Sequence, residues 1–214
     1  MHIEGAEGGA WAAAPFGALR MWDNGTAWSQ IELAKGEFKW GNIDGLIENA
    51  TSKGMTDIMM VLGTTPEWAA KELNDSDYPQ PGAASAPANM ADWDDWVSAV
   101  VDRYSDSFTS YQIWNEANLK DFWRGTPKQM AKLTKEASKI IRKGDPTAKI
   151  VSASTTLRLE SAYEKFFPPY LKALKKDKWP VDAIAVHSYP DGRGNPGTRA
   201  DLIGQVKVQL KKSK

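Results

Sequence analysis

The pair Asn115-Glu116, at the end of the apolar run from Tyr111 to Trp114, is the strongest chemical signal in this sequence. A β-branched and aromatic run of this kind predicts a buried strand, and Glu116 would lie at its carboxyl end. In a barrel of parallel strands, catalytic side chains lie at that end. A carboxyl group there can protonate a leaving group, provided that it is still protonated near neutral pH. Alone, the pair is equally consistent with a strand that ends in solvent.

The other apolar runs also end in polar side chains, which are Arg20 and Asp23, Thr64 and Thr65, Ser154 and Thr155, and His187 and Tyr189. Such groups can hydrogen-bond to the hydroxyls of a polyhydroxylated ligand. Taken singly, Arg20 is as consistent with a buried ion pair, and His187 with a hydrogen-bonded core imidazole. Their joint occurrence at successive strand ends favours a functional site.

Strand and helix patterns alternate along the chain. The sequence predicts strands over 17–22, 57–62, 111–116, 150–154 and 183–187, and helices over 43–50, 93–104, 127–144, 168–175 and 199–210. Continuous apolar strands joined by helices indicate parallel pairing, with the helices covering the sheet. A (β/α)8 barrel and a doubly wound sheet both satisfy this pattern, but no glycine-rich phosphate-binding turn follows a strand, which weakens the second interpretation.

Length, charge and cysteine content limit the possible classes. The 214 residues show no shift in composition, so we expect a single domain over 1–214. Twenty-seven Lys and Arg balance 27 Asp and Glu, which argues against a nucleic-acid partner. The absence of cysteine excludes disulfides and thiolate metal sites.

Neither a signal peptide nor a membrane span is recognisable. Residues Met1 to Glu7 lack the charged and apolar blocks of a signal peptide, and no apolar run approaches the ~20 residues of a membrane helix. We expect a soluble chain that does not enter a membrane. Its compartment stays open, and an extracellular location is compatible with an N-terminus that has been trimmed.

Several motifs together resemble the clan A glycoside hydrolases. They are Arg20 in one strand, Gly63-Thr64-Thr65-Pro66-Glu67-Trp68 after the next, Trp114-Asn115-Glu116 and His187-Ser188-Tyr189. Within the clan, Leu19-Arg20-Met21-Trp22-Asp23, the helix that contains Asp44, and Trp114-Asn115-Glu116-Ala117-Asn118 are most similar to family 39 and its bacterial relatives. The resemblance runs through nearly the whole chain and preserves the order of its elements.

This resemblance implies a (β/α)8 barrel that cleaves β-linked glycosides of an oligosaccharide or polysaccharide with retention of configuration, without a cofactor or a metal. Glu116 would be the general acid/base, and Asn115 would hold the 2-hydroxyl of the substrate. Arg20 would support the nucleophilic carboxylate, while His187 and Tyr189 would line the same site. These roles follow from the family and not from spacing alone.

The sequence departs from the family pattern in its number of strand-helix units. The pattern reaches about six units and offers no second Glu at a seventh strand, and Met1-His2-Ile3-Glu4 would be the end of the first strand. We therefore expect a shortened barrel without its last two units, inactive alone, whose open edges favour self-association or a complementing chain. Glu4, Glu67 and Glu160 lie near strand ends, but nothing besides position recommends them as the nucleophile.

Ten tryptophans raise the question of sugar stacking, although packing explains most of them. Trp68 and Trp123 each follow a strand end and are the candidates for contact with substrate. The long loop over 74–89 is expected to shape substrate choice.

Three other functions compete with this interpretation. A noncatalytic carbohydrate-binding protein on the same barrel scaffold is the main alternative, because the second Glu is missing. A metal hydrolase would need His2, His187, Asp23 and Glu116, but two histidines and no His-x-His pair argue against a metal. A Schiff-base aldolase would need a lysine at a strand end, and no predicted strand ends in one.

Overall fold

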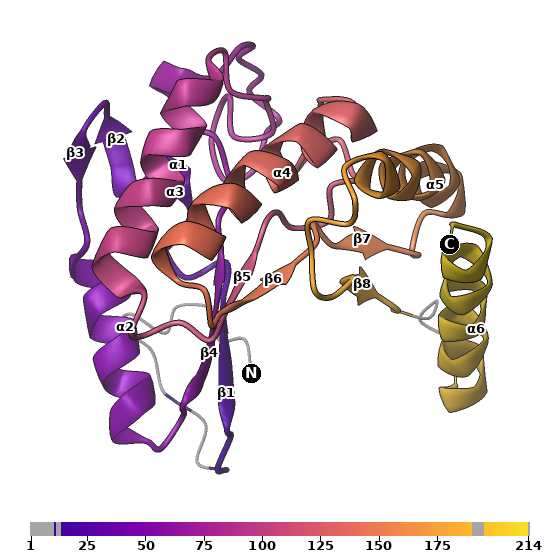
Figure 1. Cartoon of the computed structure of the whole chain (residues 1–214), viewed down its shortest axis with the longest axis horizontal. Helices are drawn as coiled ribbons and strands as arrows, with labels where there is room; N and C mark the ends of the chain where they lie inside the picture. Colours follow the sequence, from indigo (N-terminus) through magenta and orange to yellow (C-terminus); the bar gives the residue numbers. More distant parts are fainter. Residues whose placement is uncertain (1–10, 12–13, 190–194, 214) are drawn as a thin grey trace.

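The computed structural model describes residues 11, 14–189 and 195–213, which alternate between strands and helices (Figure 1). In chain order, the elements of the first half are β1 (Ala18–Met21), α1 (Trp28–Ile31), β2 (Glu32–Ala34), β3 (Glu37–Phe38), α2 (Gly41–Ser52), β4 (Asp57–Val61), η1 (Glu67–Ala69) and α3 (Met90–Tyr104). Those of the second half are β5 (Ser110–Gln112), α4 (Pro127–Gly144), β6 (Lys149–Val151), β7 (Thr155–Thr156), α5 (Glu160–Lys176), β8 (Val186–His187) and α6 (Pro196–Ser213).

A parallel sheet in the order β1-β4-β5-β6 is the centre of the fold. Met60 of β4 pairs with Met21 of β1 on one side and with Tyr111 of β5 on the other. Beyond β6, Val151 forms a bridge with Ala183, and β7 pairs in parallel with β8. The strands with their helices thus form part of a (β/α)8 barrel, and the predicted parallel pairing is confirmed.

Two apolar cores of unequal size hold the molecule together. The larger lies between the central sheet and α1 to α4, and it contains a group of packed indoles. Trp28 stacks on Trp96 with ring centroids 6.2 Å apart, and Trp40 stacks on the same ring at 5.8 Å. The smaller core consists of Leu157, Tyr163, Phe167, Leu171 and Val206, contributed by α5, α6 and the chain before α5.

Helix α4 begins and ends where the sequence predicted. The Thr126 hydroxyl accepts a hydrogen bond from the Gln129 amide at 3.2 Å, and the Gln129 side chain accepts one from the Thr126 amide at 2.8 Å. This reciprocal capping box satisfies two amides that would otherwise lack a partner at the helix start.

The start of α5 was predicted wrongly. The helix begins at Glu160, not at Pro168, and it carries Pro168 and Pro169 in its interior. A proline inside a helix removes a hydrogen bond and costs about 3 kcal/mol. Burial of Phe166 and Phe167 before the prolines, and of Tyr170 after them, on one continuous face outweighs that cost.

The last helix and the strands also differ from the predictions. Helix α6 is longer than predicted, but Val206 is its one buried residue and Ile203 is exposed. Strand β5 ends at Gln112 instead of Glu116. Strand β8 is short and half-buried, although its apolar composition predicted a fully buried strand.

A short antiparallel hairpin of β2 and β3 was not predicted. Its turn passes through Gly36 at φ +78°, a conformation that glycine adopts without steric cost. The first predicted strand end, at Met1 to Glu4, lies outside the described residues.

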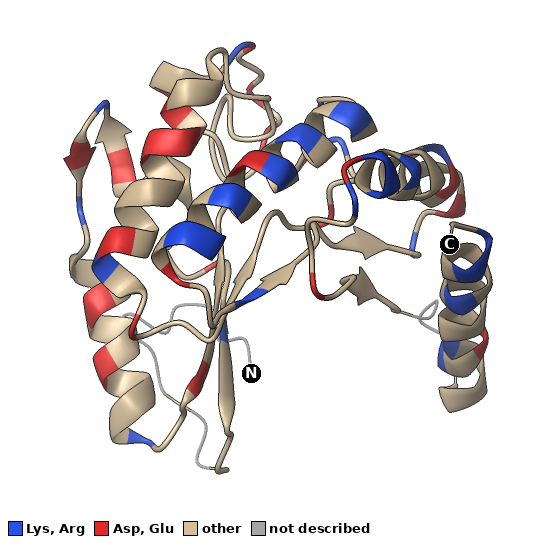
Figure 2. Ribbon diagram, in the orientation of Figure 1, with Lys and Arg blue, Asp and Glu red and all other residues tan. Residues whose placement is uncertain are grey.

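The charges are separated along the chain, although their total is zero. Residues 27–106 contain 14 Asp and Glu but 5 Lys and Arg, whereas residues 126–214 contain 8 acidic and 19 basic residues. Figure 2 accordingly shows acidic residues on α2, α3 and the β2–β3 hairpin, and basic residues in excess on α4, α5 and α6. The net charge of zero is thus the sum of an acidic part and a basic part of the chain.

Candidate active site

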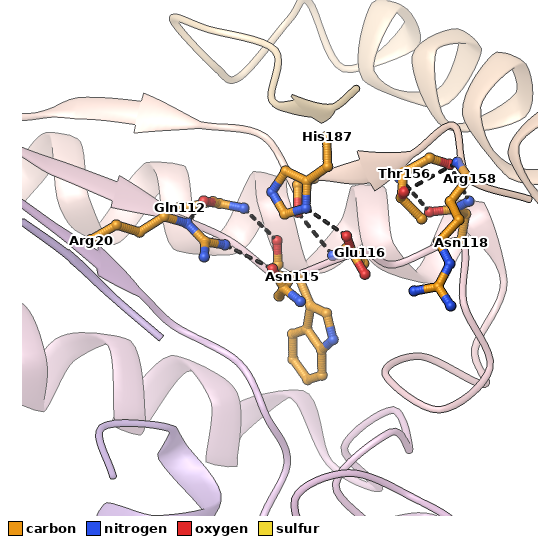
Figure 3. A network of polar contacts seen from close by, with 10 residues as sticks. Arg20, Gln112, Asn115, Glu116, Asn118, Thr156, Arg158 and His187 are labelled. Carbon is orange, nitrogen blue, oxygen red and sulfur yellow. Dashed lines mark hydrogen bonds and ion pairs between the residues drawn. The ribbon is translucent and has the colours of Figure 1, made fainter. Parts of the chain in front are cut away.

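A network of polar side chains crosses the carboxyl ends of the strands, from Arg20 to His187 (Figure 3). Arg20 extends from β1 and donates from Nε to Gln112 Oε1 at 2.9 Å and from Nη2 to Asn115 Oδ1 at 2.8 Å. Gln112 in turn donates from Nε2 to the Trp114 carbonyl at 2.9 Å. Each of these groups is held by at least one neighbour, so the orientation of the Asn115 amide is fixed.

Glu116 follows Asn115 in a turn with a left-handed backbone, at φ +40°. Its amide donates to Ser154 Oγ at 2.8 Å, and the next amide, of Ala117, donates to the Ser154 carbonyl at 2.9 Å. The Ser154 amide donates back to the Trp114 carbonyl at 2.9 Å. A non-glycine residue adopts such a conformation only where its surroundings hold it. Here the segment between β6 and β7 does so.

The carboxylate of Glu116 is paired with His187. Glu116 Oε1 lies 2.7 Å from His187 Nδ1, and the two side chains are 15% and 20% exposed. The ring of Tyr189 meets that of His187 edge to face, with centroids 5.9 Å apart. One carboxylate oxygen of Glu116 is therefore engaged by the imidazole of His187.

Arg20 supplies the positive charge of the network. Burial lowers the pKa of its guanidinium, while the neighbouring Tyr189, Asp23 and Glu116 act in the opposite direction. A guanidinium nevertheless stays protonated in proteins. The site thus contains a fixed cation beside the Asn115-Glu116 pair.

Two further contacts fix the chain around Glu116. Asn118 donates from Nδ2 to the Thr156 carbonyl and accepts from the Thr156 amide at Oδ1, both at 2.9 Å. Trp114 is fully buried and donates from Nε1 to the Phe122 carbonyl at 2.7 Å. A Cβ at Gly63 would lie 2.6 Å from the Trp114 ring, so only glycine allows this packing.

Five of the seven predicted site residues come together in the structure. Arg20, Asn115, Glu116, His187 and Tyr189 lie along one side of the strand ends. These residues are spread from position 20 to position 189 of the sequence, so their proximity is a result of the fold.

Trp68 lies in a different hollow. Its Nε1 donates to the Glu32 carbonyl at 2.8 Å, and its ring packs edge to face on Trp28. The hollow has a volume of about 370 Å³ and is also lined by Lys35 and Asp92. These contacts account for the position of the Trp68 side chain by packing and hydrogen bonding within the protein.

Trp123 is buried, with 2% of its surface exposed. Its ring meets Trp114 at 5.1 Å, and a Cβ at Gly125 would lie 2.4 Å from its far edge. No free face remains for a sugar, so the predicted substrate contact at Trp123 is corrected to a role in packing.

Sequence reasoning missed the roles of Gln112 and Asn118. Gln112 was a polar residue inside an apolar strand, and that exception was the available signal. Asn118 was part of a quoted motif, but nothing in the sequence indicated its partner Thr156. Ser154 was expected to meet ligand hydroxyls, and the structure instead directs its hydroxyl to the Glu116 amide.

The residues considered for other roles are scattered. Glu67 and Glu160 are exposed, at the starts of η1 and α5, while His2 and Glu4 lie outside the described residues. Within the described part of the chain, no three His, Asp or Glu side chains are grouped as metal ligands would be. A search of the same residues for a helix able to span a bilayer found none.

Comparison with known proteins gives a consistent result. The family model of the glycosyl hydrolases of family 39 matches residues 22–210. A curated beta-xylosidase of Caldicellulosiruptor saccharolyticus is 27% identical over 161 residues, which cover 72% of this chain and 31% of the relative. The chain thus spans about a third of the length of that relative.

Solved structures share the fold. A monomeric beta-xylosidase from Caulobacter crescentus CB15 superposes with a TM-score of 0.68 at 22% identity, over 92% of this chain and 43% of that one. A glucosidase from Croceicoccus marinus gives a TM-score of 0.69 at 16% identity, over 93% and 43%.

Proposed function

The chain belongs to the glycosyl hydrolases of family 39, and on that basis we propose that Glu116 is the acid/base of a site that hydrolyses β-linked O-glycosidic bonds with retention of configuration. The observation that carries this proposal is the pairing of Glu116 with His187 beside the Arg20-Asn115 hydrogen bond. It is the arrangement expected of a proton donor next to a group that binds a sugar hydroxyl.

The Asn115 amide would bind the substrate. Arg20 engages Oδ1, so the NH₂ group of Asn115 is the part that can donate to a hydroxyl of the sugar. A hydrogen bond to the 2-hydroxyl that strengthens as positive charge develops on the ring lowers the barrier. Because Asn115 is fixed by Arg20, little reorganisation is needed at that moment.

Glu116 would act in both halves of the reaction. In the first, a carboxylate nucleophile bonds to the anomeric carbon, the glycosidic C–O bond breaks, and Glu116 Oε2 gives its proton to the departing oxygen. In the second, Glu116 takes a proton from water, whose oxygen bonds to the anomeric carbon while the glycosyl ester breaks. His187 would hold Oε1 throughout, so that Oε2 keeps its direction.

The nucleophile is a separate part of the proposal. We propose that its carboxylate comes from a strand not represented in the printed sequence, supplied by more of the same polypeptide or by a complementing chain. The chain alone would then bind glycosides with little turnover. The name of the curated relative suggests β-xylosides as the first substrates to test.

The test compares leaving groups in a polypeptide that contains this sequence together with the nucleophile. We expect Glu116→Gln to lower kcat/KM for xylobiose by about 10²- to 10⁴-fold, because its leaving alkoxide needs a proton. Cleavage of dinitrophenyl β-xyloside should lose far less, since that leaving group departs without one. Azide, which needs no base, should accelerate the second half of the reaction in the variant.

Two results would contradict the proposal. Equal losses on both substrates would exclude Glu116 as the proton donor. Full binding of xylobiose without cleavage, even in the longer polypeptide, would favour the alternative of a noncatalytic carbohydrate-binding protein. Asn115→Asp tests the proposed role of Asn115 separately, because it keeps the side-chain shape but replaces the donating NH₂ group.

A further inference from the structure

A groove lies between α4 and α5, and none of its lining residues belongs to the network of Arg20 and Glu116. The groove has a volume of about 1100 Å³. Its apolar lining comes from short or rigid side chains, which are Pro127, Ala131, Pro168, Pro169 and Ala173. Pockets for small ligands hold about 300–1,000 Å³, so this groove is large enough for part of another polypeptide.

Positive charge borders the groove on both helices (Figure 2). The lysines that line it are all exposed, and they are Lys128, Lys132, Lys165, Lys172 and Lys176. Within the described part of the chain, none of them takes part in an ion pair. Asp177 also lines the groove, but its carboxylate is already bound to Lys135 at 2.8 Å. The groove therefore has an excess of positive charge.

The three lysines of α5 form a straight row. Lys165, Lys172 and Lys176 stand at positions i, i+7 and i+11 of the helix. Residues at this spacing lie on one face of an α-helix. We call these three residues the lysine row.

An acidic row with the same spacing lies on α3 and the turn that follows it. Asp95, Asp102 and Asp106 are exposed and also stand at i, i+7 and i+11. Ser98 and Ala99, between the first two, have small side chains, and with Asp95 and Asp102 they line the hollow of about 370 Å³ described above. Among the described residues, no ion pair involves any of these three aspartates. The hollow leaves room for long side chains from outside.

The lysine row and the acidic row match in length as well as in charge. With a rise of 1.5 Å per residue, the second and third members of each row lie about 10.5 and 16.5 Å from the first. If the two helices lie side by side and point in the same direction, each aspartate meets a lysine. In the opposite direction, the middle members miss each other by about 4.5 Å. Helix α4 packs between α3 and α5, so the two rows of one molecule do not meet.

We propose that this chain associates with a second copy of itself, with the acidic row of one molecule against the lysine row and groove of the other. The contact is independent of the glycosidase function proposed above and uses neither Asn115 nor Glu116. Because the two surfaces differ, the contact is head to tail, and each assembly keeps one free row at either end. Exposed ion pairs are individually weak, so the association is weak and decreases with salt.

The test is sedimentation velocity of the intact chain at several protein concentrations. The average mass should rise with concentration at about 0.01 M salt and fall to that of a monomer at about 1 M, where charges are screened within about 3 Å. Lys172→Glu and Asp102→Lys should each weaken association by at least about tenfold, because each places like charges opposite one another. The double variant, with both changes, should associate again, since the pair is restored in reverse.

Mixing the two single variants gives a second check. The intact acidic row of Lys172→Glu fits the intact lysine row of Asp102→Lys, so the mixture should associate although neither variant does so alone. Lys207→Glu and Asp201→Lys change charges by the same amount at exposed positions of α6, and they should associate like the unmodified chain. Circular dichroism and thermal melting establish that every variant is folded.

Three results would overturn the proposal. One is a monomeric unmodified chain at every concentration in low salt. Another is association that Lys172→Glu and Asp102→Lys leave unchanged, which would place the contact elsewhere, such as at open strand edges. The third is a double variant that stays monomeric, because residues 102 and 172 would then not face each other.

Discussion

The sheet region, residues 18–151, and the C-terminal region, residues 155–213, are built differently. The sheet region contains the four-stranded parallel sheet and nearly all of the larger core, whereas the C-terminal region has the two-residue strands β7 and β8 and the smaller core. The candidate site draws on both, because Glu116 belongs to the first and His187 to the second. The geometry of a proposed catalytic pair therefore depends on how well the less buried region is held against the more buried one.

Three sets of contacts tie the regions together. The hydroxyl of Tyr170 meets the Thr134 hydroxyl at 2.9 Å and accepts from the Ala153 amide at 3.2 Å. Asn118 binds the backbone of Thr156 in both directions. Arg142 binds Asp182, which precedes β8.

The largest effect is expected in the sheet region. Trp96 is fully buried, stacks on Trp28 and Trp40, and donates to the Leu62 carbonyl at 2.9 Å. Trp96→Ala should lower the free energy of unfolding by about 3–5 kcal/mol, because it leaves a cavity and an unpaired carbonyl. Urea unfolding measures this loss. A change below about 1 kcal/mol would mean that the indole group does not support the core as described.

A smaller and more local effect is expected in the C-terminal region. Leu171 of α5 is fully buried in the smaller core. Leu171→Ala should cost about 2–3 kcal/mol, near the low end for such changes, because few neighbours surround the cavity. Native-state hydrogen exchange should show faster exchange in α5 and α6 with little change in β4 and β5. Equal loss of protection in both regions would erase the distinction between them, and Lys172→Ala, at the exposed neighbour, is the control.

The smallest effect on stability is expected from the ion pair between Arg142 and Asp182. The hydrogen bond from Arg142 lowers the pKa of the Asp182 carboxyl, and the Ile150 amide acts in the same direction. A lowered native pKa stabilises the fold above the unfolded value of about 4, and this stabilisation is lost as the pH falls through the native pKa. Both side chains are partly exposed, so the contribution should not exceed about 1 kcal/mol.

Thermal unfolding measured from neutral to acidic pH tests the contribution of this ion pair to stability. Asp182→Asn should be less stable than the unmodified chain near neutral pH, and the difference should shrink on acidification. Asp201→Asn, at an exposed acid of α6, should show no such difference. A difference for Asp182→Asn that stays constant with pH would show that its charge is not the cause.

Local signals in the sequence were sufficient to predict much of the fold. The alternation of apolar strands with amphipathic helices predicted the parallel sheet, and Thr126 with Gln129 predicted the start of α4. These signals are local because a period of hydrophobicity or a capping box is complete within a few residues. That Asn115-Glu116 follows a buried strand could be predicted for the same reason, although β5 itself ends at Gln112, and the sequence motifs also indicated the family to which the chain belongs.

Tertiary structure alone decided the rest. The left-handed turn at Glu116 depends on Ser154, 38 residues away, and the pairing with His187 spans 71 residues. The internal prolines of α5 depend on a buried face that no local rule reports, and the burial of Trp123 depends on packing against Trp114. Such features arise when segments distant in the sequence share one interior, because burial and hydrogen-bond partners are properties of the packed chain and not of its local composition.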